Sequence, residues 1–278
     1  MIYLSCEVKS GLGEDTFWTW FSRSFPKTSF ELPKKLNPED ILMRYSTLGY
    51  LPVAGKQIAI CWELIMQMRD LYDSECYDEK ISKIYETARY CTYRTVATEA
   101  SVKEYSKFGS VEVIPIGVDT DLFRPIENKH GLREKYNLPQ NKKIGVWIGT
   151  PHHMKGFAKL LEYAAQFPEI HWVIIWKWEP ESGNLINASN FVKIPQAQIC
   201  ELINAADFFF CTSRLHTYYM GEWEAMACDI PFVYAESTIP EFPIDSSSRQ
   251  LVFQHGWDRK SVQKKWEDFF ERHGVEYK

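Results

Sequence analysis

Residues suited to phosphate chemistry follow short apolar runs at two places in the chain. Lys155 comes shortly after Gly149, which directly follows the apolar run 144–148. Its ammonium group is a compact charge that suits a phosphate or a diphosphate; the alternative is an ordinary solvated lysine. Gly11 and Gly13 follow the apolar run 2–6, where glycines would let the backbone approach a phosphate or another substrate. Gly-x-Gly is a common turn sequence, so this second signal needs independent support.

Two acidic residues stand at places where carboxylates can do chemistry. Glu63 directly follows the apolar run 58–62, and it either faces a cleft or is a buried acid with partners. Glu224 lies near the start of a predicted helix, where the helix dipole favours a negative charge in any protein. The seven cysteines are scattered, with no Cys-x-x-Cys pair and no zinc-binding spacing.

The composition argues against several classes of protein. The 278 residues carry a net charge of −5 and no concentrated Lys/Arg run, so a nucleic-acid partner is not expected. No stretch approaches the roughly 18 apolar residues of a membrane span, and the first residues lack the pattern of a signal peptide. The scattered cysteines fit reduced thiols, so we expect a cytoplasmic protein. The length and the 45% apolar content suit two domains, each with its own core.

Strands alternate with helices in the first part of the chain. The predicted strands are 2–6, 41–45, 58–62, 95–97 and 111–116, and the predicted helices are 14–25, 78–93 and 101–108. Short apolar runs bounded by turn residues suit buried parallel strands. Their alternation with helices indicates βαβ units and a parallel sheet.

The pattern restarts after a break that contains Pro115, Gly117 and Pro125. The predicted strands are 144–148, 171–176, 191–194, 208–211 and 232–234, and the predicted helices are 157–166, 199–205, 222–227 and 259–272. We therefore predict an α/β protein with two doubly wound domains, 1–117 and 118–255, followed by a C-terminal helical segment, 256–278. Ligands of such sheets bind beyond the carboxyl ends of the strands, so functional residues should lie on loops just after strands.

The break between the two predicted domains resembles a known linker. Residues 113–125 read VIPIGVDTDLFRP. This is similar to the linker VIPNGVDxxxFxP of retaining GT-B glycosyltransferases of family 4, with Ile116 where that family usually has Asn. Residues 98–100, Thr-Glu-Ala, resemble the Ser-Glu-Ala segment that precedes this linker.

The second half continues the resemblance in the order that the family has. The matching segments are VWIG at 146–149, KGF at 155–157, the leucine pair at 160–161, AADF at 205–208, TS at 212–213 and EAMACDIPFV at 224–233. The similarity covers residues 95–240 well and the first 90 residues only in outline. It implies the GT-B fold, in which two Rossmann-like domains face a central cleft and the last helix packs back on the first domain.

The resemblance also implies a reaction and roles for three residues. The reaction is the transfer of a hexose from a nucleoside-diphosphate sugar with retention at the anomeric carbon. Lys155 stands where the family keeps a phosphate-binding lysine, and Glu224 where a carboxylate accepts hydrogen bonds from the ribose hydroxyls. Eight residues before Glu224 the family has a second Glu, which contacts the sugar, and this chain has His216 at that position. Glu222 is a nearby alternative carboxylate.

The loop after run 144–148 departs from the family pattern. Gly149 is kept, but Thr150 stands where an arginine is usual, which weakens the cationic clamp on the diphosphate. His152 and His153 in the same loop could compensate as hydrogen-bond donors, or they are ordinary surface residues.

Further contacts are implied for other loops. Backbone N–H groups between His216 and Glu224 would meet the phosphates and the sugar, and the loop around Ile194 would pair with the base. Trp178 either stacks on that base or fills the core. The remaining residues of the implied donor site are Gly13, Ser213, Thr217, Tyr218, Tyr219, Met220 and Gly221. Gly11 and Glu63 are expected on the acceptor side.

No cofactor beyond the donor is expected, and no essential metal. Asp119 and Asp121 have the carboxylate spacing of metal-dependent transferases, but they belong to the linker. The donor is expected to be GDP-mannose or UDP-glucose, and the acceptor a soluble glycan or glycoprotein. Two alternatives stay open: a nucleotide-sugar or glycan binding module without turnover, and another GT-B enzyme such as a sugar-nucleotide epimerase. Thr150, His216 and the absence of any histidine before His130 motivate the binding module.

Overall fold

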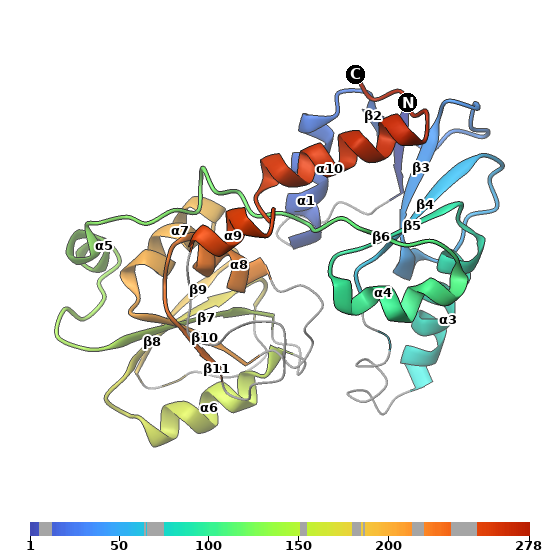
Figure 1. Cartoon of the computed structure of the whole chain (residues 1–278). Coiled ribbons are helices and arrows are strands. Elements are labelled where there is room, and N and C mark those ends of the chain that lie inside the picture. Colours follow the sequence, from blue (N-terminus) through green and yellow to red (C-terminus); the bar gives the residue numbers. More distant parts are fainter. Residues whose placement is uncertain are drawn as a thin grey trace. The chain divides into compact units, whose positions relative to one another are not determined.

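The chain folds into two compact units. The computed structural model describes residues 1–5, 13–63, 65, 75–150, 155–179, 185, 187–212, 220–234 and 249–278. One unit consists of Met1–Gly117 together with Lys260–Lys278, and the other of Val118–Arg259. Each is a layered α/β structure built on its own sheet (Figure 1).

The described strands of the first unit form a parallel sheet in the order β2-β1-β3-β4-β5-β6. The strands are β1 (Ile2–Ser5), β2 (Thr28–Ser29), β3 (Ile41–Tyr45), β4 (Lys56–Cys61), β5 (Tyr93–Val96) and β6 (Glu112–Val113). The helices are α1 (Gly13–Ser24), α3 (Glu75–Tyr90), α4 (Glu99–Tyr105) and α10 (Arg259–Arg272), with short 3₁₀ turns η1 (Ser46–Leu48) and η2 (Ser106–Phe108).

An aromatic core holds α10 against α1 in this unit. Phe21 lies on α1, and Phe25, directly after the last residue of α1, donates its amide to the Phe21 carbonyl, so the two rings lie one turn apart on the same side. The ring of Phe21 meets Trp266 of α10 at 5.6 Å, and Phe25 meets Phe270 at 5.4 Å. All four rings are buried. The apolar face of the last helix is therefore covered by the first helix of the chain.

The described strands of the second unit form a parallel sheet in the order β11-β10-β7-β8-β9. The strands are β7 (Ile144–Gly149), β8 (His171–Trp176), β9 (Ala188–Val192), β10 (Phe208–Cys211) and β11 (Phe232–Tyr234). The helices are α5 (Lys129–Lys135), α6 (Phe157–Gln166), α7 (Gln196–Ala205), α8 (Met220–Ala227) and α9 (Arg249–Gln254). The chain winds from the central β7 first to one side and then to the other, so its direction reverses between β7 and β10.

Alternate residues of the central strands face two different helical layers. Ile148 and Ile175 belong to the core that α7 and α8 cover, whereas Trp147 and Trp176 belong to the core under α6. Figure 1 shows α6 on one face of this sheet and α7 and α8 on the other. A parallel sheet covered on both faces needs strands that are apolar throughout, and β7 and β8 have such sequences.

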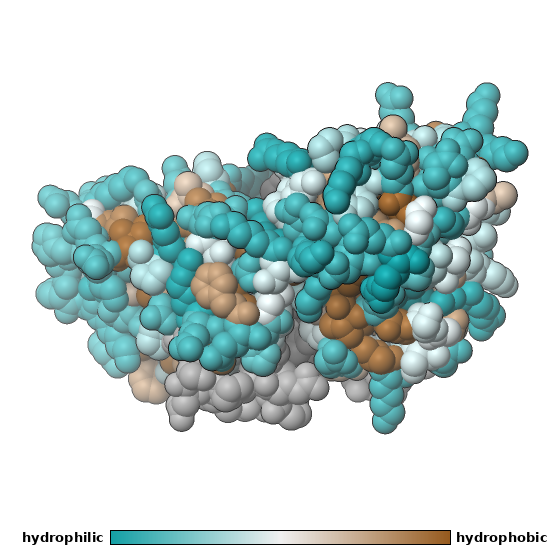
Figure 2. Space-filling view, turned by 45° about the horizontal axis from the view of Figure 1, so that its top comes forward, coloured by the Kyte–Doolittle hydropathy of each residue, from teal (hydrophilic) through white to brown (hydrophobic). Residues whose placement is uncertain are grey.

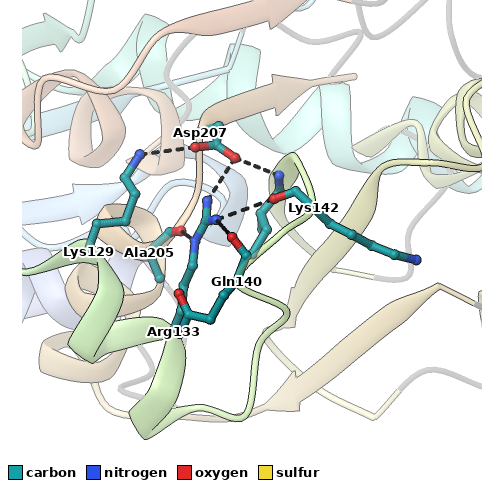
Figure 3. A network of polar contacts seen from close by, with 7 residues as sticks. Lys129, Arg133, Gln140, Lys142, Ala205 and Asp207 are labelled. Carbon is teal, nitrogen blue, oxygen red and sulfur yellow. Dashed lines mark hydrogen bonds and ion pairs between the residues drawn. The ribbon is translucent and has the colours of Figure 1, made fainter.

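A polar network fixes α5 to the beginning of the sheet (Figure 3). Asp207, just before β10, accepts hydrogen bonds from the Ile144 amide at 2.7 Å and from Arg133 Nη2 at 2.8 Å. Lys129 Nζ lies 3.2 Å from its other oxygen. Burial raises the pKa of Asp207, but the Ile144 amide and the charges of Lys129 and Arg133 outweigh this effect and lower it. The network lies at the amino-terminal ends of the strands.

The structure confirms the predicted α/β class with doubly wound sheets. Helices α5 and α9 and the two-residue strand β2 were not predicted. The second unit continues to Arg259 instead of ending at 255, because Val118 forms a parallel bridge with Asp258. Within the described residues no helix is long and apolar enough to cross a membrane. The face seen in Figure 2 is mostly hydrophilic, with separate hydrophobic patches.

Candidate functional site

The candidate site of the second unit lies where the winding of its sheet reverses. Strands β7 and β10 are neighbours, and the chain leaves them in opposite directions along the sheet. Ligands of doubly wound sheets bind at this switch point, beyond the carboxyl ends of the strands. Gly149 ends β7 and Thr212 follows β10, so the residues after them are the ones to consider.

A short chain of hydrogen bonds holds the backbone of Lys155 at this point. The Trp147 Nε1–H donates to Thr212 Oγ1 at 2.7 Å, and the Thr212 hydroxyl donates to the Lys155 carbonyl at 2.6 Å. Gly156 then adopts a left-handed φ of 69° and caps α6. The lysine that the sequence assigns to phosphate binding is therefore anchored beside the amino-terminal end of a helix, which favours anions.

Gly149 has a packing reason for being a glycine. A Cβ at this position would meet the Trp147 ring well inside the 3.0 Å that real Cβ atoms keep. Its carbonyl accepts a hydrogen bond from the Lys177 amide at 2.9 Å. The absence of a side chain is thus needed by the tryptophan core under α6, whatever ligand lies beyond it.

Glu222 is the buried acid associated with Lys155. It lies in the first described turn of α8, is 6% exposed and accepts a hydrogen bond from the Cys211 thiol. Burial raises the pKa of Glu222 to about 7, and the positive charge of Lys155 partly opposes this rise. Burial lowers the pKa of Lys155, and the charge of Glu222 acts against that change. Glu222 therefore acts as a counter-charge to the lysine.

Glu224 is buried and keeps an oxygen without a partner. It is 1% exposed, and its Oε2 makes no hydrogen bond to any described residue. Burial raises the pKa of Glu224, while the charges of Lys177 and Arg259 oppose the rise. Such an orphaned oxygen is costly unless something donates to it, and a ligand hydroxyl fits this need. The residue does not open α8, as its sequence position suggested, but lies one turn inside it.

The loops after β8 and β9 hold the residues assigned to the base. Trp178 is 37% exposed, so it does not fill the core. Lys193 adopts a left-handed φ of 51°, and its amide donates to the Trp176 carbonyl at 2.9 Å, which fixes the start of the loop that contains Ile194. Lys177, between the two tryptophans, is not among the residues that the sequence assigns to the site. Its only signal in the sequence is a lysine directly after a strand.

Several assigned residues lie outside the described part of the chain. They are Gly11, His152, His153, Ser213, His216, Thr217, Tyr218 and Tyr219. Of the others, Thr150 directly follows β7 and is half-buried, Gly13 begins α1, and Met220 and Gly221 form the start of α8.

Glu63, assigned to the acceptor side, is an acid with structural partners. Its carboxylate accepts hydrogen bonds from the Tyr45 hydroxyl at 2.5 Å and the Ser46 hydroxyl at 3.2 Å. The Tyr105 hydroxyl donates to its backbone carbonyl at 2.8 Å. Burial raises the pKa of Glu63, and the Tyr45 hydrogen bond works against that effect. Glu63 is thus half-buried, and its carboxylate has hydrogen-bond partners within the first unit.

The described residues contain no group of three or more His, Cys, Asp or Glu side chains that could hold a metal ion. The acids of the candidate site are instead accompanied by lysines and an arginine. This arrangement can bind an anion through the cations and hydroxyl groups through the carboxylates.

Curated proteins named as glycosyltransferases match about half of this chain. No protein-family profile matches the chain. It is 25% identical over 160 residues to a D-inositol 3-phosphate glycosyltransferase of Segniliparus rotundus, covering 51% of this chain and 35% of that protein. The enzyme of the same name from Mycobacterium tuberculosis is 25% identical over 162 residues, covering 52% and 33%. The chain thus spans about a third of the length of these curated relatives.

Solved structures extend the likeness to nearly the whole chain. Sucrose-phosphate synthase from Thermosynechococcus elongatus has a TM-score of 0.65 at 15% identity, covering 98% of this chain and 96% of that chain. WaaG, a glycosyltransferase involved in lipopolysaccharide biosynthesis, has a TM-score of 0.67 at 11% identity, with 99% and 95% covered. Anabaena HepE, solved with UDP-glucose, has 0.65 at 12%, with 99% and 95% covered. The chain has the GT-B fold of glycosyltransferases, and the resemblance found in its sequence is confirmed.

Proposed function

We propose that the chain is a retaining glycosyltransferase that moves a hexose from a nucleoside-diphosphate sugar to a glycan or glycoprotein acceptor. The observation that carries the proposal is that the buried Oε2 of Glu224 has no partner among the described residues. Glu224 lies one turn inside α8, the helix that also holds Glu222, the counter-charge of Lys155. The glycosyltransferase names of the sequence relatives and the shared fold support the same reaction.

Different residues of the candidate site would bind different parts of the donor. Glu224 would accept hydrogen bonds from the ribose hydroxyls, and the Lys155 ammonium would face the diphosphate. When the bond between the anomeric carbon and the phosphate oxygen breaks, its electron pair goes to the leaving diphosphate. The acceptor oxygen forms the new bond to that carbon on the same face, and its proton passes to the leaving phosphate. The cation beside that phosphate stabilises the charge that develops there.

The preferred donors are GDP-mannose and UDP-glucose. UDP-glucose is the ligand named for HepE, a structure with the same fold, and this favours a uridine nucleotide. No essential metal is proposed, because positive side chains accompany the acids of the site. Acceptor binding is assigned to the first unit.

A thermal-shift and calorimetric panel tests the proposal. UDP, GDP and ADP and their common hexose conjugates are added to the wild type and to Glu224→Ala. We expect one nucleotide series to stabilise the wild type and to lose most of that effect in the variant. If no nucleotide or nucleotide sugar binds the wild type, the proposal is wrong.

A nucleotide-sugar or glycan binding module is the second candidate. It is favoured by Thr150, an uncharged residue directly after β7, where the family pattern that the sequence resembles has an arginine. Transfer or donor hydrolysis by the wild type, lost in Lys155→Ala, would exclude this module. Epimerisation of the recovered donor would instead identify a GT-B epimerase.

A further inference from the structure

The register between β7 and β8 places a lysine beside the end of β7. Gly149 pairs with Trp176, the last residues of the two strands. The hydrogen bond from the Lys177 amide to the Gly149 carbonyl, at 2.9 Å, continues this pairing by one residue. Lys177 therefore lies next to Thr150, which supplies no charge of its own.

The alternation of the strand indicates the face to which Lys177 belongs. Trp176 faces the α6 side, and Ile175 faces the side of α7 and α8. Lys177 directly follows the last residue of β8, and continuing the same alternation by one residue would place it on the α7 and α8 side. Glu224 lies on α8, and Lys177 is the strongest positive influence on it. The strand pattern and the influence of the Lys177 charge on Glu224 thus both place this lysine on the side of α8.

Lys177 is also close enough to Lys155 for the two positive charges to influence each other. Two ammonium groups near enough to influence each other repel unless an anion lies between them. Lys155 has Glu222 as a counter-charge, and Arg259 has Asp119 at 2.8 Å. The Lys177 side chain forms no hydrogen bond or ion pair within the described part of the chain, so it is available to a ligand.

We propose that Lys177 is a second diphosphate-binding residue, which takes the place of a cation at Thr150 and clamps the diphosphate together with Lys155. This inference rests on the proposed function and deepens it. A diphosphate carries more than one negative charge, so a single lysine does not neutralise it. Lys177 follows the end of β8 and Lys155 lies beside the start of α6, so the two lysines can approach it from two elements.

The other possible role of Lys177 is to keep Glu224 ionised. The two roles differ in what they do to binding. A residue that contacts the diphosphate affects a nucleoside diphosphate but not the matching nucleoside. A residue that acts only through Glu224 affects both equally, because the ribose hydroxyls are common to the two ligands.

Calorimetry on the full chain separates these roles. The nucleoside diphosphate that binds the wild type is compared with its nucleoside, at fixed ionic strength, in Lys177→Gln, Lys177→Arg and Lys142→Gln. Lys142 is an exposed lysine before β7, at the other end of the strands, and serves as a matched control. We expect Lys177→Gln to weaken diphosphate binding by about tenfold, the effect of one charge-assisted hydrogen bond. Nucleoside affinity should hardly change, Lys177→Arg should restore most diphosphate binding, and the control should bind as the wild type does.

Equal losses for diphosphate and nucleoside in Lys177→Gln would overturn the inference and leave Lys177 as a partner of Glu224. Wild-type affinity of Lys177→Gln for the diphosphate would overturn it as well. Both outcomes keep the proposed function, because they require that the wild type binds the nucleotide. A wild type that binds no nucleoside diphosphate contradicts the proposed function itself, and the inference with it.

Discussion

Gly156 and Thr212 lie so close together that only a glycine fits. A Cβ on Gly156 would meet the Thr212 carbonyl oxygen far inside the 3.0 Å that real Cβ atoms keep. The same threonine donates its hydroxyl to the Lys155 carbonyl. The start of α6 and the end of β10 are thus joined beside Lys155, the lysine for which we propose phosphate binding.

We predict that Gly156→Ala destabilises the protein and weakens diphosphate binding. The new methyl group collides with backbone that cannot move cheaply, and the left-handed φ adds strain, so the loss should be about 2–4 kcal/mol. Gly274→Ala is the control, because Gly274 has a similar φ of 61° but its nearest neighbour would be 3.9 Å away. Urea unfolding measures both variants. Equal losses would show that the contact with Thr212 is unimportant.

Glu224→Gln should separate stability from binding. The pKa of Glu224 is raised by burial, so its ionisation costs folding energy as the pH rises above the unfolded value. Removing the charge should therefore keep or increase the melting temperature at neutral pH, while nucleotide affinity falls by about tenfold or more. Glu201→Gln should instead lower the melting temperature at neutral pH, because hydrogen bonds from Lys135 and Tyr136 stabilise the ionised form of Glu201 and lower its pKa. A less stable Glu224→Gln with intact nucleotide binding would mean a structural role for this acid.

Glu222 should make stability depend on pH in a particular direction. Its folded pKa of about 7 lies above the ordinary value of 4.5, so the folded state binds the proton more tightly than the unfolded state does. The stability that Glu222 contributes is therefore present below about pH 4.5 and lost as the pH rises to about 7, by up to about 3 kcal/mol.

Glu222→Gln tests this dependence. The free energy of unfolding, measured from pH 5 to pH 8, should fall less steeply with pH in the variant than in the wild type. Glu134→Gln, at an exposed position on α5, serves as the control and should keep the wild-type curve. Parallel curves for the wild type and Glu222→Gln would contradict the prediction.

Asp207→Asn should weaken the network of Figure 3 without affecting nucleotide binding. The substitution removes the negative charge that forms ion pairs with Arg133 and Lys129. These ion pairs lie at the amino-terminal ends of the strands, away from the candidate site. The expected loss at neutral pH is roughly 1–3 kcal/mol. The folded pKa of Asp207 is lowered, so its contribution is present above the ordinary value of 3.8 and disappears as the pH falls further.

Unfolding at pH 7 and in acid checks this expectation, and the difference between Asp207→Asn and the wild type should shrink in acid. Lys129→Met removes the more exposed partner and should cost no more than about 1 kcal/mol. A larger loss of unfolding free energy in Lys129→Met than in Asp207→Asn would contradict the central role of Asp207 in this network.

Much of the fold could be predicted because each strand is a short apolar run between turn residues. Strands such as 41–45, 171–176 and 208–211 and the helix 157–166 have the predicted bounds. The two-residue strand β2 is too short to leave a pattern. Helices α5 and α9, of seven and six residues, depend on contacts that lie far away in the sequence. Arg133 of α5, for example, bonds to Asp207.

The sequence by itself predicted the winding of the chain and pointed to two charged residues of the candidate site. Lys155 and Glu224 carry their signals locally, as a glycine-lysine loop and a helical Glu-Ala-Met-Ala segment. Only the tertiary structure decided their neighbours. Lys177 comes next to Gly149 because parallel strands pair residues that are far apart in the chain. Glu222 becomes a counter-charge to Lys155, and Glu224 keeps an orphaned oxygen, because both are removed from water. Burial and register are properties of the folded chain, and no local pattern specifies them.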